Sequence, residues 1–207
     1  MRAFDLLASM GLSPGAQRGR AFRLALQASP IQRGHAILQR LAQDSMQLRW
    51  VIEGSGVVGD VGYVPWLLNH MTNPKLARVA GEAFTNITGL DLFQGFEMST
   101  PAEFDGDPTD NPEDGNVDLH SDEGLPWPDV QKIQAWWTAS ANRFQTHVRC
   151  FMGGPVTREH CIEVLETGYQ RQRTLAAHYL CLLDPGTPLF NTSAPAWRQQ
   201  RLLAAMK

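Results

Sequence analysis

Two pairs of arginine and glutamate could perform acid–base or anion-binding chemistry, because they lie within otherwise apolar stretches. Arg49 stands four positions before Glu53, and Arg78 stands four positions before Glu82. This spacing places both charges of a pair on one face of a helix. A catalytic centre is usually unique in a chain, whereas a stacking element recurs. We therefore interpret the pairs as a structural ladder that also reaches backbone carbonyls of neighbouring turns, and we predict no catalytic residue.

The surroundings of the two arginines indicate a repeated helical unit. A helix-capping residue, Asp44 or Asn73, precedes each arginine by five positions, and a partial copy begins at Ser13. The recurrence interval of about 30 residues is typical of a two-helix repeat. Ser29, followed by proline, and Gly89 are further start and stop signals. The pattern predicts an all-α fold, an α-solenoid of HEAT-like helix pairs over residues 1–90.

Glycines within the second unit allow two interpretations. Gly54, Gly56 and Gly59 superficially match a nucleotide-binding loop, but no strand precedes them and no lysine follows. Small residues on a helix also let a neighbouring helix approach closely. We favour close packing over phosphate binding.

Charged residues are distributed unevenly along the chain. Residues 91–129 hold 12 of the 21 acidic residues and none of the 18 lysines and arginines, so the remainder carries 9 acids against 18 bases. Prolines and glycines interrupt this acidic stretch, which predicts a long irregular insertion over residues 91–128. A C-terminal helical region, residues 129–207, is expected to pack on the repeats as a cap. Its first helix is expected to run from Asp129 to about Val148, and Thr157 is expected to cap the next one.

The acidic insertion leaves three hypotheses open. It could be a solvated loop, an arm that docks on the chain's own basic face or on a basic partner, or a site for a hard cation. The acids do not follow the EF-hand spacing, and we predict no metal site. Trp127 could cover an edge of the repeats or anchor a partner. The candidate partner-binding residues are Asp105, Asp107, Asp110, Glu113, Asp114, Asp118 and Trp127.

Composition narrows the function classes. The chain has 207 residues, 43% of them hydrophobic, which suffices for a buried core. No apolar run reaches the roughly 20 residues of a membrane span, and no signal peptide is indicated. Three cysteines without paired spacing are typical of reduced thiols in a cytoplasmic protein. Arginines without interleaved aromatic residues, beside an acidic insertion, argue against nucleic-acid binding. The histidines lack metal-ligand spacing, and we predict no cofactor.

Several segments carry a resemblance to a known family. They are Val64-Pro65-Trp66-Leu67-Leu68, Ala77-Arg78-x-Ala80-Gly81-Glu82-Ala83-Phe84, Leu125-Pro126-Trp127-Pro128-Asp129, Trp136-Trp137 and Gln170-Arg171-Gln172-Arg173. Together with the rest of residues 59–92, these segments resemble bacterial HEAT-repeat proteins without assigned activity, which have short, lyase-like repeats. Family genes often lie near those of type VI secretion, and members are commonly longer, so the resemblance implies that this chain is a shortened member.

Two function hypotheses follow. The first is a non-enzymatic scaffold or adaptor that binds a protein partner, because helical repeats offer an extended concave surface and no reaction centre is visible. The resemblance adds a connection with type VI secretion, as an adaptor or as an immunity-like partner of an effector. The alternative is an enzyme or lyase-like protein that holds a small cofactor in the solenoid groove.

Overall fold

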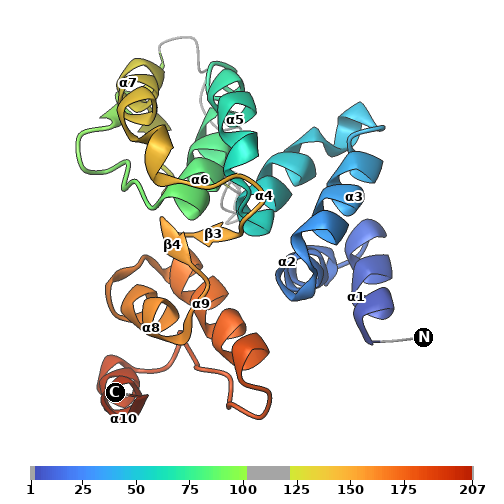
Figure 1. Ribbon diagram of the computed structural model, residues 1–207, viewed down its shortest axis with the longest axis vertical. Helices are drawn as coiled ribbons and strands as arrows, with labels where there is room; N and C mark the ends of the chain where they lie inside the picture. The colour runs from blue at the N-terminus through green and yellow to red at the C-terminus, as the bar shows by residue number, and fades with distance from the viewer. Residues whose placement is uncertain (1–2, 102–121, 207) are drawn as a thin grey trace, which may run out of the picture.

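The computed structural model describes residues 3–101 and 122–206, and helices dominate it (Figure 1). The prediction of an all-α protein is confirmed. The α-helices are α1 (Ala3–Leu12), α2 (Arg18–Ala28), α3 (Ile31–Leu41), α4 (Leu48–Val58), α5 (Val64–His70), α6 (Ala77–Thr88), α7 (Val130–Ser140), α8 (Arg158–Thr167), α9 (Gln170–Leu183) and α10 (Ala196–Met206). Short 3-10 turns, η1 (Ser45–Gln47), η2 (Val61–Tyr63) and η3 (Ala141–Arg143), adjoin α4, α5 and α7. None of the described helices is both long enough and apolar enough to cross a bilayer.

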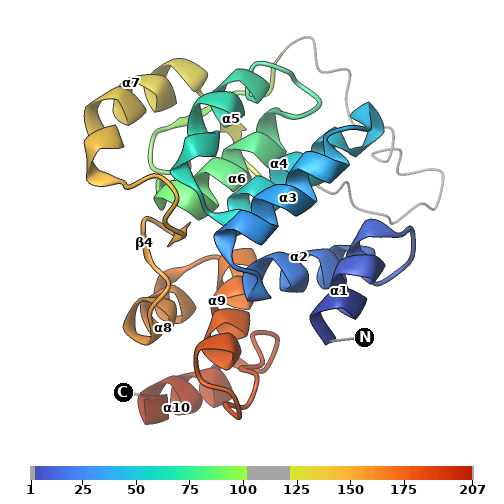
Figure 2. The ribbon, with the colours of Figure 1, turned by 45° about the vertical axis from the view of Figure 1, so that its right-hand side comes forward.

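The first six helices pack as successive pairs. Helix α1 contacts α2, α3 contacts α4, and α5 contacts α6. The second members of these pairs lie side by side, because α4 contacts both α2 and α6. Helices α8, α9 and α10 gather at the C-terminal end of the molecule, and α9 also contacts α2 (Figure 2).

A glycine on α4 permits the close approach of α4 to α6. A Cβ atom on Gly56 would lie 2.8 Å from the Cα atom of Ala83 on α6. Gly54 likewise faces side chains of Leu38 and Phe22. The interpretation of these glycines as packing positions is confirmed, and it explains why α4 keeps two residues of low helix propensity.

Some predicted capping residues stand at helix ends and others do not. Asp44 caps η1 and not α4, and α6 begins at Ala77, three residues after the turn at Asn73–Pro74. The Ser29 hydroxyl donates back to the carbonyl of Ala25 and does not cap α3. Asp129 accepts a hydrogen bond from the backbone N–H of Lys132 at the start of α7, and Thr157 does the same for His160 at the start of α8. Gly89 ends α6 in the left-handed conformation, with φ of 72°. The sequence predicted that the helix after Asp129 would continue to about residue 148, but α7 ends at Ser140 and an irregular segment follows η3.

Three hydrophobic clusters form the core. One fills the space between α4, α5 and α6 around Phe84, and a second lies under α2, α3 and α4 around Phe22. The third joins α8 and α9 around Phe151. Two short antiparallel ribbons connect these regions: β1 (Glu97–Met98) pairs with β2 (Trp127–Pro128), and β3 (Cys150–Phe151) pairs with β4 (Gly154–Pro155).

Arg149 fastens the segment before β3 to the ends of two helices. Its guanidinium donates to the carbonyl oxygens of Leu26, Gln27 and Ser29 at the end of α2, at 3.0, 2.6 and 2.8 Å. It also donates to the carbonyl of Val58 at the end of α4, at 3.2 Å. The last carbonyls of a helix have no partner within the helix, so one cation satisfies several of them together.

We expect Arg149→Ala to lower the free energy of unfolding by about 3 kcal/mol, because hydrogen bonds from a charged donor are each worth about 1.5–3 kcal/mol and are not additive. Urea denaturation followed by circular dichroism would measure the change. Arg143→Ala is the matched control, since Arg143 is exposed on η3, and we expect it to stay within about 0.5 kcal/mol of the parent. Equal effects of the two substitutions would refute the role given to Arg149.

Candidate functional site

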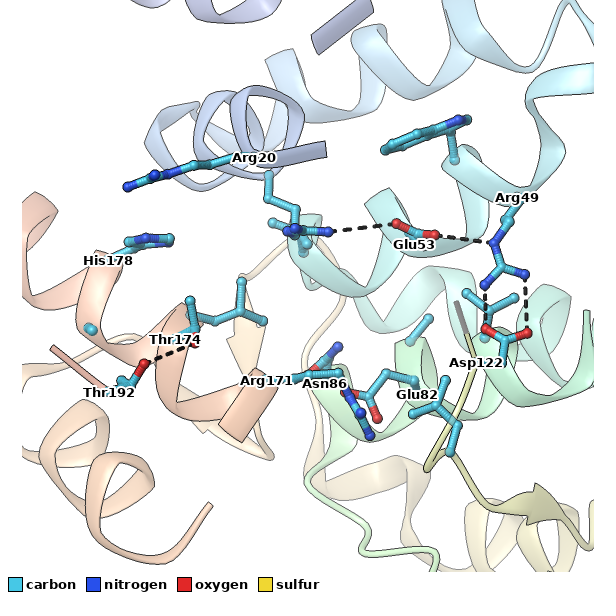
Figure 3. Close-up of a pocket in the computed structure, with 18 of the residues that line it drawn as sticks. Arg20, Arg49, Glu53, Glu82, Asn86, Asp122, Arg171, Thr174, His178 and Thr192 are labelled. Carbon is cyan, nitrogen blue, oxygen red and sulfur yellow. Dashed lines mark hydrogen bonds and ion pairs between the residues drawn. The ribbon is translucent and has the colours of Figure 1, made fainter. Parts of the chain in front are cut away.

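A cavity of about 920 Å³ lies between the inner helices α2, α4 and α6 and the C-terminal helix α9 (Figure 3). The segment between α9 and α10 closes another side through residues 189–192. Its apolar wall includes Val57, Val79, Ala83, Leu175 and Phe190. Charged side chains of both signs also line it, so the cavity combines an apolar surface with several polar groups, the composition typical of ligand pockets.

Helix α9 is held in place by polar contacts to α2 and α4. The Gln27 side-chain N–H donates to the carbonyl of Leu175 at 3.0 Å, and its Oε1 lies 3.2 Å from Nδ1 of His178. Tyr179 donates its hydroxyl to the carbonyl of Val57 at 3.2 Å. These contacts define the width of the cavity, because α9 forms the wall that faces the three inner helices.

Glu53 occupies the centre of the α4 wall between two arginines. Its carboxylate lies 3.4 Å from Nε of Arg49 and 3.9 Å from Nη1 of Arg23. Burial raises the pKa of Glu53 above its usual value, although both arginines oppose the rise. The carboxyl group is therefore easier to protonate than an exposed glutamate, and it is available as a hydrogen-bond donor or acceptor at the cavity surface.

The described end of the acidic insertion docks on the arginines of the helical pairs. Arg49 forms two hydrogen bonds with the buried carboxylate of Asp122, and Arg78 donates to the backbone carbonyl of Asp122 at 3.3 Å. Arg171 of α9 reaches the carbonyl of Gly124 at 3.5 Å. The segment that begins at Asp122 therefore lies on the chain's own basic face, beside the cavity.

Glu82 and Arg171 form an ion pair across the cavity. Their nearest atoms, Oε1 and Nε, lie 3.4 Å apart and join α6 to α9. Burial raises the pKa of Glu82 above its usual value, and Arg171 only partly counteracts this effect. Desolvation thus outweighs the attraction between the two charges, as it often does for partly buried ion pairs.

Asn86 carries a buried acceptor without a partner. It follows Glu82 by one helical turn on α6, lines the cavity and is 8% exposed. Its Oδ1 atom forms no hydrogen bond with any described residue. A buried amide oxygen without a donor costs about 1–3 kcal/mol. Its burial places this oxygen inside the cavity wall, where it lowers the stability of the fold.

The opposite end of the cavity carries positive charge from α2. Arg20 and Arg23 are exposed there, and Arg20 lies near His178 of α9 (Figure 3). Burial, followed by the two arginines, lowers the pKa of His178, so its imidazole is neutral at physiological pH. No described residue forms an ion pair with Arg20. This end of the cavity is therefore suited to an anionic group.

The predicted site residues fall into three groups. Arg49, Glu53 and Glu82 line the cavity, whereas Arg78 lies beside it with its guanidinium 4.9 Å from the centre of the Trp127 ring. Trp127 is 9% exposed, so its ring is packed inside the fold and not displayed on the surface. The acidic candidates Asp105, Asp107, Asp110, Glu113, Asp114 and Asp118 lie outside the described residues.

Several cavity residues were not predicted from the sequence. Arg171 and His178 come from α9, more than 80 positions after α6, and no local spacing connects them with Glu82 or Asn86. Asn86 follows Glu82 by four positions, so the two share a helical face. The sequence offered one signal for Asn86: an amide within an apolar stretch, on the same helical face as Glu82, indicates a buried polar contact.

Comparison with known proteins adds no family assignment. No protein-family model, curated protein or solved structure matches this chain. The site is therefore interpreted from its own geometry.

We expect Asn86→Leu to raise the free energy of unfolding by about 1 kcal/mol, because it replaces an unpaired buried amide with an apolar side chain of similar size. Thermal denaturation would measure the change. Asn69→Leu is the matched control on the exposed surface of α5, and we expect it to change stability by less than about 0.5 kcal/mol. A loss of stability in Asn86→Leu would show that the amide is satisfied in the free protein.

We expect Glu82→Gln to stabilise the protein at neutral pH and to lose this advantage as the pH falls. The pKa of Glu82 is higher in the folded protein than in the unfolded chain. The free energy of unfolding therefore falls as the pH rises from the pKa of Glu82 in the unfolded chain through its pKa in the folded protein. Melting temperatures of both proteins between acidic and neutral pH would measure the difference. Glu163→Gln, at a carboxylate with 71% side-chain exposure, is the control. A difference that does not change with pH would contradict the burial effect.

Proposed function

We propose that the protein is a non-enzymatic binding protein whose cavity receives a short peptide segment of a protein partner. The observation that carries the proposal is the cavity of about 920 Å³, in which an apolar wall is flanked by charges of both signs. We further propose that α1 to α6 are HEAT-like helix pairs of an α-solenoid. The order of helix contacts supports this arrangement, with α2, α4 and α6 on the inner surface where solenoids bind their partners.

The polar groups of the cavity are suited to a ligand with an acidic and a basic or N–H-donating end. Arg20 and Arg23 offer an anion site on α2. Glu82 offers an acceptor on α6. The apolar wall between these ends suits an aliphatic side chain. A peptide supplies all three features, because its backbone N–H groups are donors and its side chains carry charge and apolar surface.

The size and opening of the cavity also favour a peptide segment. Its volume of about 920 Å³ is at the upper end of the range for small-molecule pockets. Leu189, which is 51% exposed, extends the apolar wall toward the surface. A segment of a folded partner could enter along this edge. A place in type VI secretion, as adaptor or immunity-like partner, remains part of the proposal on the family resemblance alone.

A second candidate is an enzyme that holds a small cofactor in the same cavity. The observation that favours it is the pair Glu53 and Glu82, because carboxyl groups with raised pKa values in a cleft are typical of general acids. A chromophore or a tightly bound small molecule that copurifies with the chain would favour this candidate. A purified protein without either would favour peptide binding.

Selection of short random peptides by display, followed by fluorescence polarisation, tests the proposal. We expect enriched peptides to combine an acidic residue, an aliphatic residue and a basic residue. Arg20→Glu should weaken binding about tenfold, which corresponds to about 1.4 kcal/mol. Asn86→Leu should weaken binding while it stabilises the fold.

Arg143→Glu is the matched control for this experiment. It makes the same change of charge on η3, outside the cavity, and we expect no change in affinity beyond a small long-range effect. Replacement of residues 105–118 by a Gly/Ser linker separates the cavity from the acidic insertion. If the linker variant loses peptide binding and the cavity variants retain it, the peptide contacts the insertion, which would contradict a cavity site. Failure to enrich any peptide would contradict peptide binding itself.

A further inference from the structure

A second cluster of chemically active side chains lies outside the cavity. It joins His35 of α3, Asp60 at the start of η2 and His147 in the segment between η3 and β3. The three candidate ligand atoms all lie within 4.8 Å of one another. These residues come from three separate segments, which explains why the sequence showed no metal-ligand spacing.

We propose that His35, Asp60 and His147 bind one divalent transition-metal ion, for which Zn²⁺ is the natural probe. Two imidazoles and one carboxylate are a ligand set common to zinc and other first-row metal sites. Three protein ligands leave coordination positions open for water or for a molecule from solution.

Two separations within the cluster are those expected around a metal ion, and the third, between the two imidazole nitrogens, is within 4.8 Å. Asp60 Oδ2 lies 3.1 Å from Nε2 of His35 and 3.3 Å from Nδ1 of His147. Metal–ligand bonds of about 2.1 Å place neighbouring ligand atoms about 3.0 Å apart in octahedral geometry and about 3.4 Å apart in tetrahedral geometry. Hydrogen bonds between a cation and a carboxylate are shorter, about 2.7–2.9 Å. One carboxylate oxygen thus faces two imidazole nitrogens at ligand spacing.

The surrounding groups orient the three ligands. The other oxygen of Asp60 accepts hydrogen bonds from the backbone N–H groups of Gly62 at 2.8 Å and His147 at 3.2 Å, which leaves Oδ2 for the ion. Tyr63 Oη lies 2.6 Å from Nδ1 of His35. When Nε2 binds the metal, the ring proton is on Nδ1 and is donated to this hydroxyl. Such a partner for the distal nitrogen is usual for metal-binding histidines.

The backbone of His147 also supports a positioned side chain. Its φ of 61° lies in the left-handed region, which is uncommon for a residue other than glycine. Its side chain is 83% exposed, whereas Asp60 is 2% exposed. The buried carboxylate is therefore reached from solvent through His147, which gives an ion an entry path and places the open positions at the surface.

Zinc binding to the full-length protein, after removal of metals with a chelator, tests the proposal. Competition with a chromophoric chelator measures affinity and stoichiometry, and Co²⁺ substitution reports the ligand field by its visible absorption bands. We expect one Zn²⁺ per chain. His147→Asn should weaken binding at least about tenfold, since loss of an outer-shell partner alone has an effect of that size. Asparagine also tolerates the left-handed backbone, so this variant is expected to fold.

His70→Gln is the matched control, because His70 is not one of the three proposed ligands and packs against Trp66. We expect it to retain the affinity and the Co²⁺ spectrum of the parent. His35→Gln should lose both, with folding verified by circular dichroism. Absence of saturable Zn²⁺ binding in the parent would overturn the proposal and show that the three side chains form a hydrogen-bonded network without a metal ion. Binding that His147→Asn and His70→Gln affect equally would overturn it as well.

Discussion

The hydrogen bonds of the Arg149 guanidinium fix the position of the C-terminal helices relative to the N-terminal helices. The guanidinium satisfies carbonyls at the end of α2 and at the end of α4, and so fixes the segment before β3 against both helices. The backbone N–H of Cys150 then donates to the carbonyl of Gly59 at 2.8 Å. Because β3 leads into α8 and α9, this anchor determines where α9 stands opposite the inner helices. The cavity exists because that placement leaves a space between them.

Several groups that lower the stability of the fold lie at the cavity wall. Glu53 and Glu82 are buried enough for desolvation to raise their pKa values, and the Asn86 oxygen has no donor among the described residues. A core selected for stability alone would replace these groups with apolar residues. Local violations of this kind are expected at functional sites, where the cost is offset elsewhere in the fold. These unfavourable groups support ligand binding more directly than the pairing of the first six helices does.

Local signals predicted much of the helical structure but little of the cavity. Asp129, Thr157 and Gly89 marked helix ends because capping depends on neighbouring residues. The early end of α7 was missed, since the irregular segment after it is held by long-range contacts such as those of Arg149. The cavity pairs residues of α6 with residues of α9, and the metal-ligand cluster joins three segments. Such contacts require the tertiary fold, which no spacing within one helix contains.

The most direct test of the central claim is methyl-group NMR spectroscopy of the protein during titration with the tightest selected peptide. Peptide binding in the cavity predicts shifts for the methyl groups of Val57, Val79 and Leu175, which face the proposed ligand. Methyl groups of Leu6 and Leu183, exposed on other surfaces, should remain unchanged. Shifts confined to methyl groups outside the cavity, or a spectrum unchanged at saturating peptide, would contradict the assignment of the cavity as the binding site.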